Sequence, residues 1–196
     1  MQMNEMMKRA TILFLMFSVF FIAGSFQGDA QDKSVQKVNI SEIPFFDSIK
    51  KADQLHVFLF LGTDCPISQK YVHTLKSLYN TFPEVTFYGI IPHHFNEKEI
   101  KTYQEDYEIP FQLYRDAHNS IAKIFSATIT PEAFLIDSQG TVYYQGAIDN
   151  WFYALGKNRP KATEHYLKRA IEEVSALQTV TTPRTDAIGC LIEMKH

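Results

Sequence analysis

Only two cysteines, Cys65 and Cys190, occur among the 196 residues, so the chain can form at most one intramolecular disulfide. The formal net charge of −3 offers no basic surface of the kind that nucleic-acid binding requires. The sequence also has no glycine-rich phosphate loop, no carboxylate pair typical of glycosidases and no serine-hydrolase nucleophile elbow. These absences leave the two thiols as the main candidates for chemistry.

The longest apolar run, residues 10–23, follows Lys8 and Arg9 and is shorter than the roughly 20 residues that span a bilayer. Small and polar residues come next, so the order matches that of an export signal. We therefore predict a signal peptide at 1–28 and a periplasmic or extracellular location. An uncleaved N-terminal anchor is the alternative, and it is the only membrane contact we expect. Export would place both cysteines where disulfides persist.

The rest of the chain reads as a flexible lead-in at 29–42, one domain at 43–178 and a C-terminal tail at 179–196 that carries Cys190. The expected strands are 55–62, 84–92, 111–116, 132–137 and 141–148, and the expected helices are 66–79, 96–107, 117–127 and 162–177. Early alternation of strands and helices implies parallel pairing, and the last two strands form a hairpin. The prediction is an α/β fold with a central mixed sheet flanked by helices.

Cys65 stands where a buried strand ends and a helix begins, an edge that ligand and catalytic groups favour. Pro66 suits the first helical turn because its missing N–H costs nothing there. The backbone N–H groups of Ser68 and its neighbours are then free to face the sulfur and favour a thiolate. We therefore expect an exposed, ionised, nucleophilic Cys65. The alternative is a buried cysteine that packs as a small hydrophobe.

Four segments, "DCPISQKYV", "TPEAFLID", "GAIDNWFYALGKNRPKATEHYL" and "PRTDAIGC", occur in this order within residues 55–191. Together they resemble the thioredoxin-like superfamily, in its redoxin (AhpC/TSA-like) branch of exported proteins. The resemblance implies a thioredoxin-like fold and a redox-active cysteine, without a cofactor. It also implies a cis bond between Thr130 and Pro131 that lies beside Cys65 and offers backbone groups to a partner's extended chain.

The chain departs from two better-known groups of this superfamily. Thioredoxins carry Cys-x-x-Cys, whereas Ser68 stands in the fourth position here, where it assists the sulfur or simply caps the helix. Peroxiredoxins place a threonine with two residues between it and the cysteine, and they use a downstream arginine. Here Thr63 has one intervening residue, and Arg115 does not fit the arginine position. A thiol peroxidase is therefore a weaker alternative.

Cys190 is the candidate resolving thiol, and we hypothesise that the apolar tail around it folds back to Cys65. Separate packing of Cys190, or pairing with another protein, stays open. A copper-chaperone site made of Cys65, Cys190, His93 and His94 is a further alternative, since histidine and cysteine are common metal ligands.

The leading prediction is a thiol-disulfide oxidoreductase that acts outside the cytoplasm. Cys65 attacks, Cys190 or an external thiol resolves, Ser68 and Thr63 assist, and Pro66, Thr130 and Pro131 position the substrate. The expected partners are a protein or small-molecule thiol or disulfide and an electron donor that the sequence does not name.

Overall fold

A computed structural model describes residues 36–45, 47 and 54–194 of the chain. These residues belong to one compact unit. The predicted signal peptide at 1–28 lies outside the described residues. Within the described part, no helix is long and apolar enough to cross a membrane.

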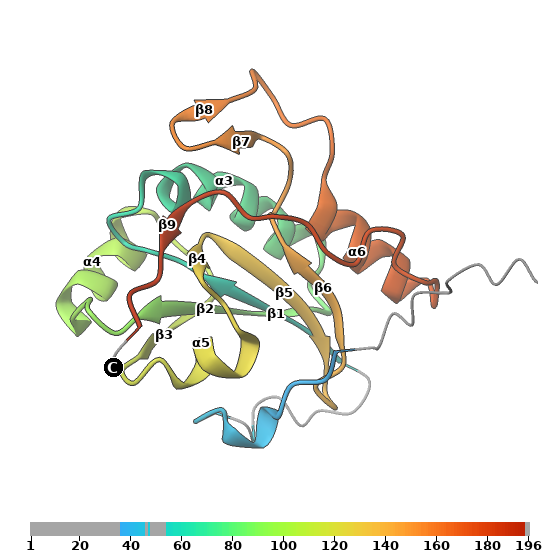
Figure 1. The fold of residues 1–196 in the computed structure, drawn as a ribbon, viewed down its shortest axis with the longest axis horizontal. Coiled ribbons are helices and arrows are strands. Elements are labelled where there is room, and N and C mark those ends of the chain that lie inside the picture. Colours follow the sequence, from blue (N-terminus) through green and yellow to red (C-terminus); the bar gives the residue numbers. More distant parts are fainter. Residues whose placement is uncertain (1–35, 46, 48–53, 195–196) are drawn as a thin grey trace, which may run out of the picture. The chain divides into compact units, whose positions relative to one another are not determined.

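A five-stranded sheet in the order β3-β2-β1-β5-β6 forms the centre of the unit (Figure 1). The first three strands in the chain pair in parallel, and β5 and β6 join them in antiparallel orientation. The strands are β1 (Leu55–Phe60), β2 (Thr86–Pro92), β3 (Gln112–Asp116), β5 (Glu132–Asp137) and β6 (Val142–Gly146). The predicted mixed sheet is confirmed, including its C-terminal hairpin.

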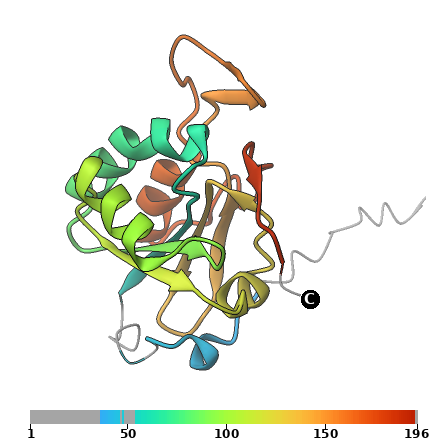
Figure 2. The ribbon, with the colours of Figure 1, turned by 90° about the vertical axis from the view of Figure 1, so that its left-hand side faces the viewer.

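Helices cover both faces of the sheet, with α3 and α4 on one side and α5 on the other (Figure 2). The helical elements are η1 (Ile40–Glu42), α3 (Pro66–Thr81), α4 (Glu97–Asp106), α5 (Ser120–Phe125) and α6 (Tyr166–Ser175). In β1, Val57 and Leu59 join the core under α3, whereas Phe58 and Phe60 join the core under α5. Burial on both faces explains why this strand reads as a continuous apolar run.

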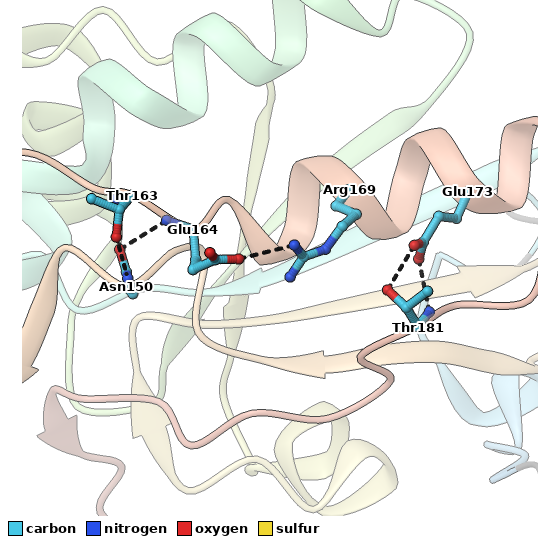
Figure 3. Close-up of polar contacts among 6 residues, drawn as sticks. All are labelled: Asn150, Thr163, Glu164, Arg169, Glu173 and Thr181. Carbon is cyan, nitrogen blue, oxygen red and sulfur yellow. Dashed lines mark hydrogen bonds and ion pairs between the residues drawn. The ribbon is translucent and has the colours of Figure 1, made fainter.

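The predicted helix at 162–177 begins later, at Tyr166. The side-chain oxygen of Asn150 accepts hydrogen bonds from the N–H groups of Thr163 and Glu164, at 2.8 and 3.1 Å (Figure 3). These contacts hold the two residues in the loop, while the Glu164 carboxylate accepts a hydrogen bond from Arg169 on the first turns of α6. Asn150 thus competes with the helix for these two N–H groups, and the apolar spacing of residues 162–177 could not reveal it.

The predicted flexible lead-in is wrong for residues 36–42. Val38 and Ile40 are buried, and the Val38 N–H donates to the Gly140 carbonyl at 2.8 Å. Gly140 has a φ of +82°, and a Cβ there would lie 2.3 Å from the Val38 oxygen. Glycine in the β5–β6 turn therefore lets the N-terminal segment pack against the domain.

Two short strand pairs were not predicted. β7 (Phe152–Ala154) and β8 (Lys157–Asn158) form a hairpin that projects from the domain (Figure 1). β4 (Ile129–Thr130) pairs in antiparallel orientation with β9 (Cys190–Leu191), which belongs to the C-terminal tail. The tail is thus part of the folded unit.

Anchors hold this tail along its length. The Glu173 carboxylate on α6 accepts hydrogen bonds from the N–H and hydroxyl of Thr181 (Figure 3). Farther along, the Thr185 N–H donates to the Gln145 carbonyl on β6 at 3.0 Å. The Thr185 hydroxyl lies 2.6 Å from the Tyr144 hydroxyl and accepts the Ala147 N–H at 2.9 Å. The tail therefore reaches β4 from a fixed point on β6.

Candidate functional site

Cys65 is the N-cap residue of α3, with Pro66 in the first turn of the helix. The loop that carries it passes close to β4, because a Cβ on Gly62 would lie 3.0 Å from the Cys65 Cβ and 3.1 Å from the Thr130 hydroxyl. The Cys65 carbonyl accepts the Gln69 N–H at 3.0 Å, so the first helical hydrogen bond begins at the cysteine. The sulfur therefore sits at the positive end of a sixteen-residue helix.

The tail brings Cys190 to this sulfur from 125 positions away in the sequence. Thr130 and Cys190 are direct partners in the β4–β9 register. The Cys190 Sγ donates to the Cys65 Sγ at 2.9 Å, and both cysteines are free. A disulfide, with an S–S bond of about 2.05 Å, can form after a sulfur movement of about 1 Å.

The Thr130–Pro131 peptide bond is cis. The Thr130 carbonyl lies 3.2 Å from the Cys65 Sγ and accepts a hydrogen bond from it when the thiol is neutral. β4 thus lies directly against the Cys65 sulfur, with one edge turned toward the tail.

Glu132, which sequence analysis overlooked, supports β4 from the far side of Pro131. Its buried carboxylate accepts the Thr128 N–H at 3.3 Å and the Gln145 side-chain amide at 3.1 Å. Burial raises the pKa of this carboxyl, while the hydrogen bonds act against that rise. The sequence held one signal for this role. Glu132 begins the predicted strand 132–137, and a carboxylate that is buried in a strand requires hydrogen-bond partners.

Cys65 is buried, with only 1% of its surface exposed. The expectation of an exposed sulfur is therefore wrong for this conformation of the chain. Cys190, which is only partly buried, lies against the sulfur, and the Thr130 carbonyl also contacts it. The tail thus contributes to covering the Cys65 sulfur.

The surroundings of Cys65 favour its thiolate. Burial alone would raise the pKa of the Cys65 thiol, but hydrogen bonds from Cys190, from the N–H and hydroxyl of Ser68 and from the Ile67 N–H lower it overall. Burial, the hydrogen bond to Cys65 and the charges of Cys65 and Asp64 raise the pKa of Cys190 to about 12. The two shifts favour a thiolate at Cys65 beside a neutral thiol at Cys190 that donates a hydrogen bond to it.

Ser68 is fully buried and touches both sides of the cysteine turn. Its hydroxyl accepts the Gly62 N–H at 3.2 Å and contributes to lowering the pKa of Cys65. Thr63 is held through its backbone, because its carbonyl accepts the Gln69 side-chain amide at 2.8 Å. Ser68 is thus placed to assist the sulfur, whereas this contact of Thr63 shapes the loop.

The proposed copper ligands are not assembled. Among the described residues, no group of three or more histidine, cysteine, aspartate or glutamate side chains lies close enough to hold a metal ion. The carbonyl of His93 accepts Arg115 at 2.7 Å, and the ring of His94 lies over Phe95. The two histidines therefore belong to the loop after β2, and Arg115 braces that loop.

Ser68→Ala is expected to slow alkylation of Cys65 by iodoacetamide about 3- to 10-fold at pH 7, as expected for the loss of one hydrogen bond to a charged sulfur. The pKa of Cys65 should rise, so the rate should recover as pH increases. The measurement is the pH dependence of modification, read on the peptide that contains Cys65. Ser77→Ala, at an exposed position of the same helix, is the control. An unchanged pH profile would show that Ser68 only packs.

Two solved structures share this fold at low sequence identity. An uncharacterised conserved protein from Geobacillus kaustophilus is 22% identical, with a TM-score of 0.64 over 76% of this chain and 81% of that one. A hypothetical protein from Sinorhizobium meliloti 1021 is 21% identical, with a TM-score of 0.62 over 76% of this chain and 82% of that one.

A secreted disulfide oxidoreductase of Mycobacterium tuberculosis, homologous to Escherichia coli DsbE, is 19% identical, with a TM-score of 0.49 over 69% of this chain and 92% of that one. No curated protein matches the chain. The family model described as AhpC/TSA matches residues 26–145, which is more than half of the sequence. The chain therefore belongs to the AhpC/TSA family and has a thioredoxin-like fold.

Proposed function

We propose that the chain is a thiol-disulfide oxidoreductase that acts outside the cytoplasm, with Cys65 as its nucleophile and Cys190 as its resolving thiol. One observation carries the proposal: the Cys190 Sγ lies 2.9 Å from the Cys65 Sγ at the N-terminus of α3. The lowered pKa of Cys65 and the raised pKa of Cys190 support this division of roles. The export signal predicted at residues 1–28 supports the location.

In the first step, the Cys65 thiolate attacks one sulfur of a partner disulfide. A disulfide forms between Cys65 and the partner, and the partner's second sulfur leaves as a thiolate that takes up a proton. The backbone beside Pro131 positions the partner, and Ser68 stabilises the charged sulfur before the attack.

In the second step, Cys190 loses its proton and attacks the Cys65 sulfur. The Cys65–Cys190 bond forms, and the partner's remaining sulfur leaves and is protonated. The charge on Cys65 no longer raises the pKa of Cys190 at this stage, because the Cys65 sulfur is now in a disulfide. One partner disulfide becomes two thiols, and a dithiol donor, itself oxidised to a disulfide, reduces the chain again.

The test treats the reduced chain with hydroxyethyl disulfide, followed by acid quenching, alkylation and intact-mass analysis. We expect loss of both alkylatable thiols, a mass lower by two hydrogens and a linked pair of peptides containing Cys65 and Cys190. In the Cys190→Ser variant the reaction should instead stop at the mixed disulfide, in which Cys65 carries one half of the reagent. The proposal fails if oxidised monomer still alkylates on both cysteines. If the chain, with dithiothreitol as donor, turns over hydrogen peroxide faster than the disulfide, its function is that of a thiol peroxidase instead.

A further inference from the structure

The edge of β4 is occupied by the chain's own tail, and the contacts between them are mostly contacts of the main chain. The Ile192 N–H donates to the Thr128 carbonyl at 2.8 Å, and the Thr130 hydroxyl donates to the Cys190 carbonyl at 3.4 Å. With the antiparallel register of Thr130 and Cys190, this is the pattern of strand addition to a sheet edge. Such bonds accept any extended segment whose side chains fit the neighbouring positions.

The position before the cysteine accepts only glycine. A Cβ on Gly189 would lie 1.9 Å from the carbonyl oxygen of Thr130 and 3.1 Å from the Ile129 side chain. The nearer contact is with backbone, so it cannot be relieved by rotating a side chain. A segment that takes the path of the tail therefore needs glycine directly before its cysteine.

The two positions after the cysteine differ sharply. Leu191 is 78% exposed, whereas Ile192 is 6% exposed and joins the buried cluster that contains Phe60, Phe125 and Phe134. Side chains of successive strand residues point to opposite sides, so the first position faces solvent and the second fills an apolar socket. The socket selects a large aliphatic side chain two residues after the cysteine.

Residues 189–192 can leave the edge of β4 while the anchor of the tail at Thr185 stays folded. The tail before this stretch is fixed to β6 by Thr185, whose N–H donates to the Gln145 carbonyl and whose hydroxyl contacts the Tyr144 hydroxyl. The stretch itself forms a strand of only two residues. Besides the bonds to Thr128 and Thr130 given above, the Asn119 side chain donates to the Glu193 carbonyl at 3.0 Å. Short strands of this kind lie at the low end of local stability.

We propose that residues 189–192 mark out a polypeptide-binding groove whose partners carry Gly-Cys-x-Ile, or the same pattern with leucine or valine last. Such a partner segment lies antiparallel to β4, places its cysteine opposite Thr130 and displaces the chain's own tail. The proposal rests on the proposed function for its redox consequence. The binding itself requires no thiol.

Because the tail is tethered, it competes with a partner as a local ligand at an effective concentration of about millimolar. The test therefore compares the full-length chain with a full-length Ile192→Asp variant, in which a charge cannot enter the socket. Leu191→Asp, at the neighbouring exposed position, is the matched control. The probe is a fluorescein-labelled peptide of residues 186–194 that carries Cys190→Ser, and its binding is followed by fluorescence anisotropy.

The peptide should bind the Ile192→Asp chain at least about 10-fold more tightly than it binds the wild type or the Leu191→Asp chain. Within the peptide, Gly189→Val or Ile192→Asp should weaken binding at least about 10-fold, and Leu191→Asp should leave it within about twofold. In parallel, a bulky maleimide should modify Cys65 at least about 10-fold faster in the Ile192→Asp chain. Far-UV circular dichroism checks the fold, and a Gly189→Val chain replaces the Ile192→Asp chain if that one unfolds.

Binding that ignores the peptide sequence would overturn the proposal, as would faster Cys65 modification without peptide binding. Unchanged Cys65 modification in both released variants would also overturn it, because Gly189 and Ile192 would then not hold the tail. Failure of the proposed function looks different. In that case the thiol-free peptide still binds with the stated selectivity, but the Cys65–Cys190 disulfide does not form.

Discussion

Cys65→Ser is expected to lower the rate of protein-disulfide reduction, with dithiothreitol as donor, by at least about 1,000-fold, because a serine hydroxyl is not ionised at neutral pH. Residual activity in such variants comes from the rest of the site, and burial still raises the pKa of Cys190, so Cys190 is a poor substitute nucleophile. The measurement is the initial rate of reduction of a disulfide-linked fluorescent substrate. Ser77→Ala, exposed on α3, should keep the wild-type rate.

Cys190→Ser separates the two steps of the same reaction. It should leave the attack by Cys65 in place and accumulate the mixed disulfide, which non-reducing electrophoresis detects as a species that carries the substrate. If Cys65→Ser instead accumulates the mixed disulfide and Cys190→Ser does not, the roles of the two sulfurs are reversed. If both variants keep the wild-type rate, neither thiol carries the activity.

Gly189→Ala is expected to slow formation of the Cys65–Cys190 disulfide by about 100-fold, since displacement of a reacting group by about 1 Å has effects of this size. The added methyl group would lie 1.9 Å from the Thr130 carbonyl oxygen, so the tail must move away from β4 and carry the Cys190 sulfur with it. The measurement is the rate at which both thiols disappear after addition of hydroxyethyl disulfide. The mixed disulfide on Cys65 should form at least as fast as in the wild type.

Asp186→Ala, an exposed position on the same tail, is the control and should close the disulfide at the wild-type rate. Equal rates for Gly189→Ala and the wild type would mean that the reactive conformation does not use the β4–β9 pairing. The proposed roles of the two sulfurs would survive that result, but the path of the tail would not.

Much of the central fold was predictable because its signals are local. The apolar run of β1 reads as a strand that is buried on both faces, and Pro66 marks the first turn of α3. Asn96 and Glu99 form the capping box that begins α4, as their spacing of three residues indicates. Each of these features depends on neighbours within one or two turns of the chain.

The tail illustrates the opposite case. β9 has two residues, too few to show any periodicity, and its partner β4 also has two. Two features decide the pairing of β9 with β4. Gly189 permits close approach to the Thr130 backbone, and Ile192 inserts into a core cluster that other elements build. This pairing places Cys190 against the Cys65 sulfur, so the expectation of an exposed sulfur could not have been corrected from local sequence.

By itself, the sequence determined the mixed sheet with its helical crossovers and the place of Cys65 at the start of a helix, because strand burial and helix starts depend on residues that are close in the chain. Only the tertiary structure decided that Cys190 lies against Cys65, that Glu132 braces β4 and that the tail covers the sulfur. These contacts join segments up to 125 residues apart. They depend on shape and space between distant surfaces, which no local pattern of residues records.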